Sequence, residues 1–417
     1  MPVISPAFKI KDFRLLFFTR LFGTMGLQAQ AVIVGWQVYQ LRPDPLLLGL
    51  VGLTEAIPAI TCSFFSGHIV DTNRAALVYR ISVLALFLNT CLIFSAVAPF
   101  IPFSNDQRLI LLFVGVFISG ASRSFSSPAV FTLIPQIVPK DLISSAVAWN
   151  SSTFQFAAIL GPSLGGLLYG SFGAVTAFLF PSALLALSLL FSLFFSSETN
   201  AFRNPSRREP FAKSLRTGID FTLKHKVLLS TMLLDMFSVL FGGAVAVLPM
   251  FADQVLHTAA FGLGLLRAAP SVGSAIIAIT LAVRPLKTVT GRSLLWVVAG
   301  FGACMIAFGL SRNFALSLFL LALSGAFDGV NMVIRSTILQ LLTPSGMRGR
   351  VSALSSIFIT SSNEIGAFES GLAARLLRLV PSVVFGGIMT LFIVGAVSWR
   401  VPELRQTEIG KDTPLPD

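Results

Sequence analysis

The chain has 417 residues, of which 54% are hydrophobic and only 12% charged, whereas soluble domains average about 45 to 50% and about 25%. With a mean hydropathy of +0.84, it cannot build a polar exterior around one water-soluble core. The composition therefore excludes a soluble globular protein and indicates an integral membrane protein. A net charge of +12 would suggest a nucleic-acid partner in a soluble protein, but here the basic residues lie mostly at the ends of apolar segments, so we expect no nucleic acid.

Apolar segments of the length that a membrane helix needs recur along the chain. A bilayer core of about 30 Å requires roughly 20 apolar residues per helix. We predict twelve spans at residues 14–39, 46–69, 76–100, 108–135, 142–170, 173–195, 227–251, 259–283, 291–311, 314–342, 350–378 and 381–399. The predicted fold is an all-α integral membrane protein with twelve transmembrane helices.

The basic residues are distributed unequally between the two sides of the membrane. If the N-terminus lies inside, 21 Lys and Arg lie on the inner face and five on the other. The five are Arg42, Arg108, Arg312, Arg375 and Arg378. The positive-inside rule then predicts that both termini are cytoplasmic, which agrees with an even number of spans.

The longest polar break divides the spans six plus six. We predict an N-terminal half at 1–197, a cytoplasmic linker at 198–226, a C-terminal half at 227–400 and a cytoplasmic tail at 401–417. Within the linker, apolar residues recur at helical spacing, which is typical of an amphipathic helix on the membrane surface; a solvated linker is the alternative.

The two halves show an internal repeat. Residues 119–168 align without gaps on 324–373, and the matches include Gly120 with Gly325 and Gly161 with Gly366. The first span aligns on the seventh, and the second on the eighth, with small changes of offset at the loops. We therefore predict two six-helix pseudo-repeats in parallel order.

Nine charged residues remain inside the predicted spans, where each is costly in hydrocarbon and must face protein or water. They are Arg20, Glu55, Arg123, Asp235, Arg267, Asp328, Arg335, Glu364 and Glu369. The repeat sets Arg20 against Asp235, Glu55 against Arg267 and Arg123 against Asp328, with opposite signs in each case. The alternatives are a functional polar interior and structural ion pairs that orient the helices.

Two motifs indicate a family. GHIVDTNR at 67–74 resembles the cytoplasmic motif of the major facilitator superfamily, with Thr72 where an Arg is usual. GPSLGG at 161–166 resembles the antiporter motif of its exporter branches, with Ala157 in place of an upstream Gly. Small residues let helix backbones approach closely, and a proline bends a helix, as a lateral hinge requires.

Longer segments resemble the enterobactin-exporter-like group of this superfamily. They include FRLLFFTRLFG, SRSFSSPAVFTLIPQIVP, TPSGMRGRVSAL and SSNEIGAFESGL. The resemblance implies a proton-driven, multi-pass exporter of the bacterial inner membrane, with spans 1, 4, 7 and 10 around a central cavity.

The resemblance implies that four of the charged residues line the cavity: Arg20, Arg123, Asp235 and Asp328. The roles of the other charged residues are predicted from their positions along the spans. The expected substrate and proton-coupling residues are Arg20, Arg123, Asp235, Asp328, Arg335 and Glu364. The supporting charges are Glu55, Arg267 and Glu369, with Glu369 expected to pair with Arg267. Asp328 and Arg335 are seven residues apart and share a helix face. The gate and hinge residues are Gly67, Asp71, Arg74, Gly161, Pro162, Gly165, Gly166, Arg348 and Arg350.

The leading hypothesis is a secondary active exporter of a small siderophore-like or drug-like molecule, working by proton antiport with alternating access. A lipid flippase or uptake carrier on the same fold, and a non-transporting receptor or scaffold, are the alternatives. The chain has no GxxxxGK[ST] loop and no HExxH motif, and its three Cys lie in apolar segments, so we expect no enzyme, no cofactor and no metal. The expected partners are a small-molecule substrate, a proton or other coupling ion and the lipid bilayer, and we expect a monomer.

Overall fold

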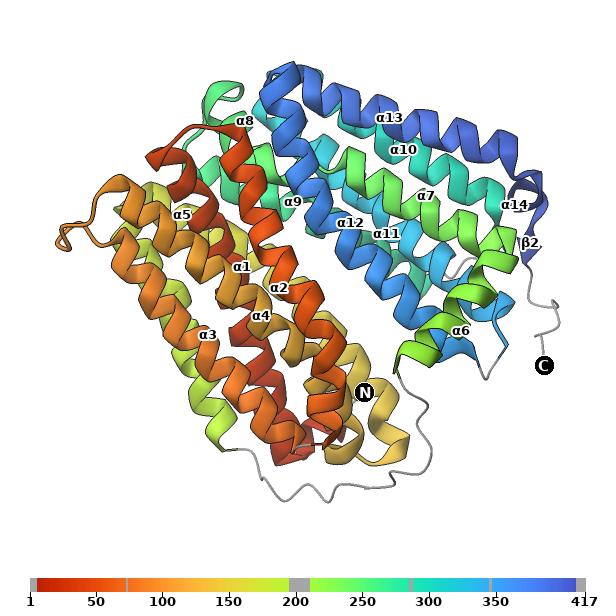
Figure 1. Ribbon diagram of the computed structural model, residues 1–417, viewed down its shortest axis with the longest axis horizontal. Helices are drawn as coiled ribbons and strands as arrows, with labels where there is room; N and C mark the ends of the chain where they lie inside the picture. The colour runs from red at the N-terminus through yellow and green to blue at the C-terminus, as the bar shows by residue number, and fades with distance from the viewer. Residues whose placement is uncertain (1–5, 73, 195–210, 285–287, 345–346, 410–417) are drawn as a thin grey trace. The chain divides into compact units, whose positions relative to one another are not determined.

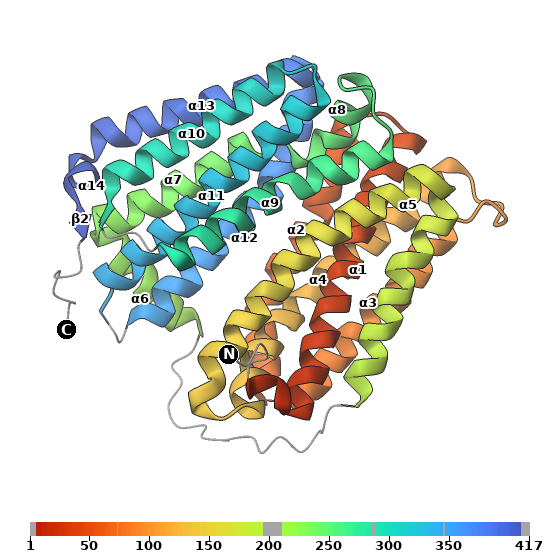
Figure 2. The same cartoon turned by 180° about the vertical axis from the view of Figure 1, so that it is seen from behind.

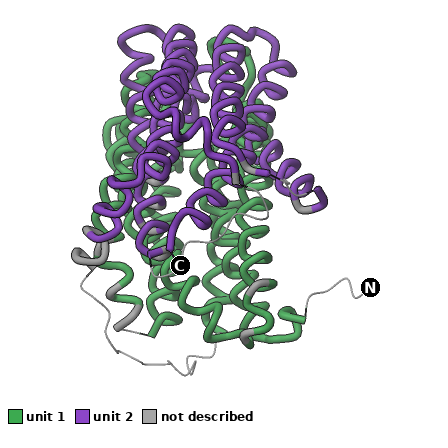
Figure 3. Tube along the Cα trace, turned by 90° about the vertical axis from the view of Figure 1, so that its right-hand side faces the viewer, with its two compact units in different colours: residues 1–203, 252–268 green, residues 204–251, 269–417 purple. Residues whose placement is uncertain are grey.

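The computed structural model describes residues 6–72, 74–194, 211–284, 288–344 and 347–409. The chain forms two compact units, which Figure 3 shows in different colours. Unit 1 comprises residues 1–203 and 252–268, and unit 2 comprises residues 204–251 and 269–417. The domain boundaries predicted from the sequence stay a prediction.

The first part of the chain consists of helices joined by short turns. Its elements are η1 (Pro6–Lys9), α1 (Lys11–Leu41), α2 (Pro45–Thr72), α3 (Ala75–Val97), α4 (Asn105–Ile137), η2 (Lys140–Leu142) and α5 (Ile143–Leu193). Ser104 begins α4 with a capping box, in which Ser104 and Gln107 each bond the other's backbone N–H. This arrangement satisfies two of the amide groups that the first helical turn leaves without partners.

The second part adds more helices and one short pair of strands. The elements are α6 (Phe211–Lys224), α7 (Lys226–Gly242), η3 (Val245–Val247), α8 (Leu248–Gln254), α9 (Ala260–Val283), β1 (Val289–Thr290), α10 (Gly291–Leu310), α11 (Phe314–Leu342), α12 (Arg348–Leu377), α13 (Leu379–Arg400), α14 (Pro402–Gln406) and β2 (Glu408–Ile409). β1 and β2 are antiparallel, with Val289 opposite Ile409 and Thr290 opposite Glu408.

Among the described residues, nine helical segments are long and apolar enough to cross a membrane. One of them, within α5, holds two predicted spans, and Figure 2 shows α5 as two arms. The arms meet at Gly173, whose φ of 77° is available to glycine without steric cost. The first and eleventh predicted spans are the helices α1 and α12, which are outside these nine. The all-α fold is confirmed, while the count of twelve crossings stays a prediction.

The seventh predicted span is not one regular helix. α7 ends at Gly242, and a 3-10 turn separates it from α8. The break leaves backbone carbonyls without helical partners, which is costly in hydrocarbon. Ser370 of α12 donates a hydrogen bond from its hydroxyl to the carbonyl oxygen of Gly243, so a neighbouring helix satisfies one of the groups that the break exposes.

Within unit 1, α1 packs along α5, and α4 packs against both α2 and α3, as Figure 1 shows. One apolar core includes Phe13 and Leu16 of α1, Tyr79 of α3 and Leu133 of α4, all nearly inaccessible to solvent. Many large apolar side chains face outward; Phe131, for example, is 83% exposed. An outer surface of this kind suits contact with lipid tails and would aggregate in water.

Within unit 2, α10 lies beside α13 and α11, and α7 packs against α12 and α13. The core between these helices includes Leu228 and Leu234 of α7, Leu294 of α10 and Ile338 of α11. Leu404 of the short helix α14 also lies in this core and is fully buried. The segment that follows the last long helix is thus anchored to the bundle.

Equivalent glycines form close helix contacts in both units. A Cβ built on Gly120 of α4 would lie 2.2 Å from the Glu55 oxygen of α2, and one on Gly325 of α11 would lie 1.9 Å from the Pro270 oxygen of α9. Gly161 and Gly366 form a second matched pair. A Cβ built on Gly161 would lie 2.8 Å from the Met25 oxygen, and one on Gly366 would lie 2.9 Å from the Leu240 oxygen. These glycines are matched in the sequence alignment, so the contacts support the predicted repeat.

Replacing Gly325 by Ala should destabilise the protein by about 1 to 3 kcal/mol, because the new methyl group overlaps the Pro270 carbonyl and the backbones must separate. Gly395→Ala is the matched control, since a Cβ at Gly395 of α13 meets nothing within 4 Å. Thermal unfolding of the purified variants in detergent measures the difference. Equal melting temperatures for the two variants would contradict the close contact.

Candidate functional site

A buried ion pair joins α7 to α11 in unit 2. Asp235 is 4% exposed and Arg335 is 7% exposed. Arg335 donates from Nη1 to Asp235 Oδ2, and Asn331 donates from Nδ2 to Asp235 Oδ1 at 2.7 Å. Asn331 and Arg335 are one turn apart on α11, so both reach the same carboxylate. Both carboxylate oxygens therefore have a donor, which is what a charge in this environment requires.

Asp328 lies one turn before Asn331 and is exposed in the structure. With Asp235, Asn331, Phe301 and Phe327 it lines a small cavity. The cavity measures about 10 Å³, which is room for roughly one water molecule. Among the described residues, Asn331 Oδ1 is a buried acceptor without a hydrogen-bond donor. The cluster thus combines a paired carboxylate, a second carboxylate on the same face of α11 as Arg335, and an amide oxygen without a hydrogen-bond donor in the described part of the chain.

Unit 1 contains a second ion pair, between Arg123 of α4 and Glu55 of α2. It is more accessible than the pair in unit 2, because the Arg123 side chain is 50% exposed and that of Glu55 is 22% exposed. Arg20 of α1 donates from Nε to Asn150 Oδ1 of α5 at 3.1 Å. Each of these contacts joins two helices of the same unit.

The pairing differs from the alignment of opposite charges in the sequence. The sequence sets Arg20 against Asp235 and Arg123 against Asp328, and places Arg335 on the same helix face as Asp328. The structure instead pairs Arg335 with Asp235 and Arg123 with Glu55. The reason is that neighbouring helices of one unit offer a partner at the same depth. The functional roles of all these residues stay predictions.

Three further charged residues of the predicted set are half-buried: Arg267 of α9 and Glu364 and Glu369 of α12. Arg267 and Glu364 both take part in interactions with other residues. The predicted pairing of Glu369 with Arg267 and the proposed proton site at Glu364 stay predictions.

The small residues of α5 lie at close contacts on two sides of this helix. Gly161 and Gly165 face α1, where a Cβ on Gly165 would lie 3.0 Å from the Ala29 oxygen. Gly166 faces the first turns of α9, where a Cβ built on Gly166 would lie 2.7 Å from the Gly264 Cα. In the other direction, a Cβ built on Gly264 would lie 2.5 Å from the Pro162 carbonyl oxygen. Side chains larger than hydrogen would separate α5 from both neighbours.

Comparison with known proteins identifies the family. The family described as a transmembrane secretion effector matches residues 3–415. The chain belongs to this family of major facilitator transporters. It is a multi-pass membrane transporter and not an enzyme, and the family places it among small-molecule exporters.

Curated relatives of the transporter include the enterobactin exporter EntS of Shigella boydii serotype 4, which is 26% identical over 401 residues, covering 94% of this chain and 92% of the relative. The EntS protein of Escherichia coli O1:K1 shows the same identity and coverage. The predicted resemblance to the enterobactin-exporter-like group is thereby confirmed.

Solved structures confirm the fold. A transporter of the POT family in complex with a thioalcohol-conjugated peptide superposes with a TM-score of 0.75 at 12% identity, over 94% of this chain and 96% of that one. The inward-open xylose transporter XylE from E. coli superposes with a TM-score of 0.69 at 13% identity, over 96% of this chain and 98% of that one.

The predicted gate residues of the transporter are divided between the units. Gly67 of α2 and the exposed Arg74 belong to unit 1. Arg350 of α12 belongs to unit 2, where it is half-buried and its Cβ lies 3.2 Å from a Cβ built on Gly218 of α6. The side chains of Asp71 and Arg348 lie outside the described residues. Since α6 contacts α12 in this way, the predicted amphipathic helix packs partly on protein.

Several uncharged polar residues of the transporter form buried hydrogen bonds that were not predicted from the sequence. Gln30 of α1 accepts a hydrogen bond from Thr90 of α3 at 2.7 Å, and Asn89 of α3 donates to Ser119 of α4 at 2.8 Å. All four are buried. Gln and Asn side chains inside apolar segments are the available signal, because a buried amide needs a partner as a charge does; the same signal would have identified Asn331.

Removing one member of the buried ion pair should leave the other charge uncompensated. Asp235→Asn and Arg335→Gln are therefore each expected to lower the free energy of unfolding by about 3 to 5 kcal/mol. Replacing both residues together should cost less than the sum of the two single changes, because no lone charge remains. Thermal unfolding in detergent measures these effects.

Lys226→Gln provides the control for this comparison. Lys226 bonds Glu403 at 2.8 Å, but both side chains are exposed. The bond raises the pKa of Lys226 and lowers that of Glu403, yet solvent screens the pair. We expect an unchanged melting temperature; a loss equal to that of Asp235→Asn would contradict the distinction between the two pairs.

Proposed function

We propose that the transporter exports a small siderophore-like or drug-like organic molecule across the bacterial inner membrane by proton antiport with alternating access. The observation that supports this most directly is the cluster of Asp235, Asn331 and Arg335 with Asp328 beside it. Ionisable residues within membrane spans are costly and are usually functional.

The cluster supports an exchange between a proton and a substrate. Antiport requires that the substrate and the proton exclude each other at one group. A donor group of the substrate, such as a catechol hydroxyl, binds the Asp328 carboxylate only after that carboxylate has released its proton. Substrate binding on the cytoplasmic side therefore releases a proton there, and a proton that binds Asp328 from the periplasmic side displaces the substrate. Asp235 and Asn331 hold Arg335 and its helix in place beside this carboxylate.

The close contacts of α5 support a role in alternating access. Gly161 and Gly165 let α5 slide along α1 without large side chains interlocking, and Pro162 bends the helix between them. In this proposal, Gly67, Asp71, Arg74, Arg348 and Arg350 form the cytoplasmic gate, and Glu364 is an additional proton site. The protein works as a monomer.

Asp328→Asn should abolish the coupling between substrate and proton movement, because an amide cannot take up or release the proton. In proteoliposomes we expect substrate-dependent proton flux to fall to background, while exchange of substrate for substrate survives. Siderophores and drugs serve as the screened substrates. Asp235→Asn should give the same result, provided that the variant protein still inserts into the membrane.

Asp106→Asn is the matched control, since Asp106 forms an exposed ion pair with Arg42 outside the cluster. Its proton flux should equal that of the parent protein. If Asp328→Asn and Asp235→Asn both transport uphill at the parental rate, the cluster is a structural ion pair and Glu364 remains the candidate for coupling. Equal transport in both directions without a proton gradient would instead favour a flippase or uptake carrier.

The proposed orientation places both termini and the linker at 198–226 in the cytoplasm. A single cysteine replacing Ser206 in a cysteine-free variant should then react with an impermeant maleimide only in inverted vesicles. A cysteine replacing Pro43, in the exposed turn between α1 and α2, should react from the periplasm in whole cells. Labelling of position 206 in intact cells would reverse the orientation.

A further inference from the structure

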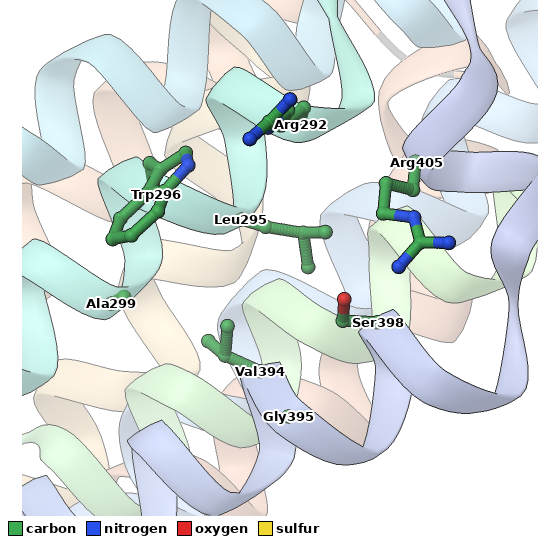
Figure 4. Close-up of a pocket in the computed structure, with 8 residues that line it drawn as sticks. All are labelled: Arg292, Leu295, Trp296, Ala299, Val394, Gly395, Ser398 and Arg405. Carbon is green, nitrogen blue, oxygen red and sulfur yellow. The ribbon is translucent and has the colours of Figure 1, made fainter.

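A pocket of about 440 Å³ opens on the outer surface of unit 2, away from the charged cluster. It lies where α10 meets α13 and α14, and Figure 4 shows its lining side chains. Arg292 of α10 and Arg405 of α14 lie at one end, and Ala299 and Val394 at the other. The positions 292 and 299 are roughly 10 Å apart along α10. The pocket therefore has a basic end and an apolar end.

The two arginines are held in place by a small structural unit at the start of α10. β1 pairs with β2, and the Gly291 N–H donates to the Thr407 oxygen at 2.9 Å. A capping box between Thr290 and Ser293 fixes the first turn of α10. On the other side, the buried Leu404 anchors α14 next to Arg405. The backbone positions of both arginines are therefore fixed by hydrogen bonds and by the buried Leu404.

The positive charge at this end is not neutralised within the described part of the chain. No acidic residue lines the pocket. Glu403, two residues before Arg405, is bonded to Lys226 instead. Neither Arg292 nor Arg405 forms an ion pair with a described residue. The Arg405 guanidinium lies beside the Ser398 side chain, and Arg292 lies on the other side of Leu295. The two exposed guanidinium groups offer several donors to an anionic headgroup.

The remainder of the pocket suits an acyl chain. Leu295, Ala299 and Val394 form apolar walls, and Gly395 leaves the space above α13 open, since a Cβ there meets nothing within 4 Å. Trp296 is 68% exposed at the rim, and tryptophan favours the level of the lipid headgroups. A soluble anion would make no use of this apolar end.

We propose that this pocket binds one anionic phospholipid, with its phosphate on Arg292 and Arg405 and an acyl chain along α10 and α13. A basic pocket between membrane helices at headgroup level is suited to such a lipid. The proposed orientation puts the pocket in the cytoplasmic leaflet, where several basic residues of the same unit also lie. The binding itself does not depend on that orientation or on the proposed export.

Native mass spectrometry of the full-length, delipidated protein in detergent tests the proposal. The probes are dioleoyl phosphatidylglycerol, dioleoyl phosphatidylethanolamine and glycerol 3-phosphate. We expect one phosphatidylglycerol to bind more tightly than either of the others. Arg292→Gln and Arg405→Gln should each weaken its binding about fivefold, and the double variant about 25-fold, from ~1 kcal/mol for each arginine near a lipid surface.

Arg284→Gln is the matched control, because Arg284 is exposed in the same unit but does not line the pocket; its affinity should be that of the parent. Gly395→Phe fills the apolar end without altering charge and should also weaken binding. If the double variant does not fold, the single variants and Gly395→Phe still decide. Equal binding of phosphatidylethanolamine or glycerol 3-phosphate, or equal loss in Arg284→Gln, would overturn the proposal.

Discussion

The structure depends on one constraint: inside a hydrocarbon layer, a polar group must find its partner within the protein. In unit 2, Asp235 meets this constraint with Arg335 and Asn331. In unit 1, Gln30, Thr90, Asn89 and Ser119 do so without any charge. The break after α7 is possible because Ser370 bonds the Gly243 carbonyl. Such contacts join specific pairs of helices at specific positions.

The fold could be predicted from the sequence because its signals are long. Apolar segments of about 20 residues and an ungapped repeat predicted an all-α membrane protein in two halves. The superfamily itself was indicated by the motifs at 67–74 and 161–166, which resemble those of known members. The kink at Gly173 and the break at Gly243 were less accessible, because a single glycine in an apolar segment does not reveal its backbone angles. The β1–β2 pair could not be predicted from the sequence, because a strand of two residues is too short to show an alternation of apolar and polar side chains.

The site was less predictable than the fold. The buried charges identified Asp235 and Arg335 as candidates, since any charge in an apolar span needs an explanation. Their pairing could not be read from the alignment, because a repeat relates equivalent positions and not neighbouring ones. Asn331 was missed since it carries no charge, although its place one turn from Arg335 makes it the second donor to Asp235.

The matched glycine contacts also bear on how a duplicated gene diverges. Gly120 and Gly325, and Gly161 and Gly366, are positions where two main chains touch, so any mutation there is opposed in either copy from the moment of duplication. A charge is less restricted, because a new partner on an adjacent helix compensates for its loss or reversal. The two copies were thus free to exchange acid for base at the positions of Arg20 and Asp235 while their helix crossings remained the same. Relatives with different substrates should accordingly vary first in their ion pairs and last in these four glycines.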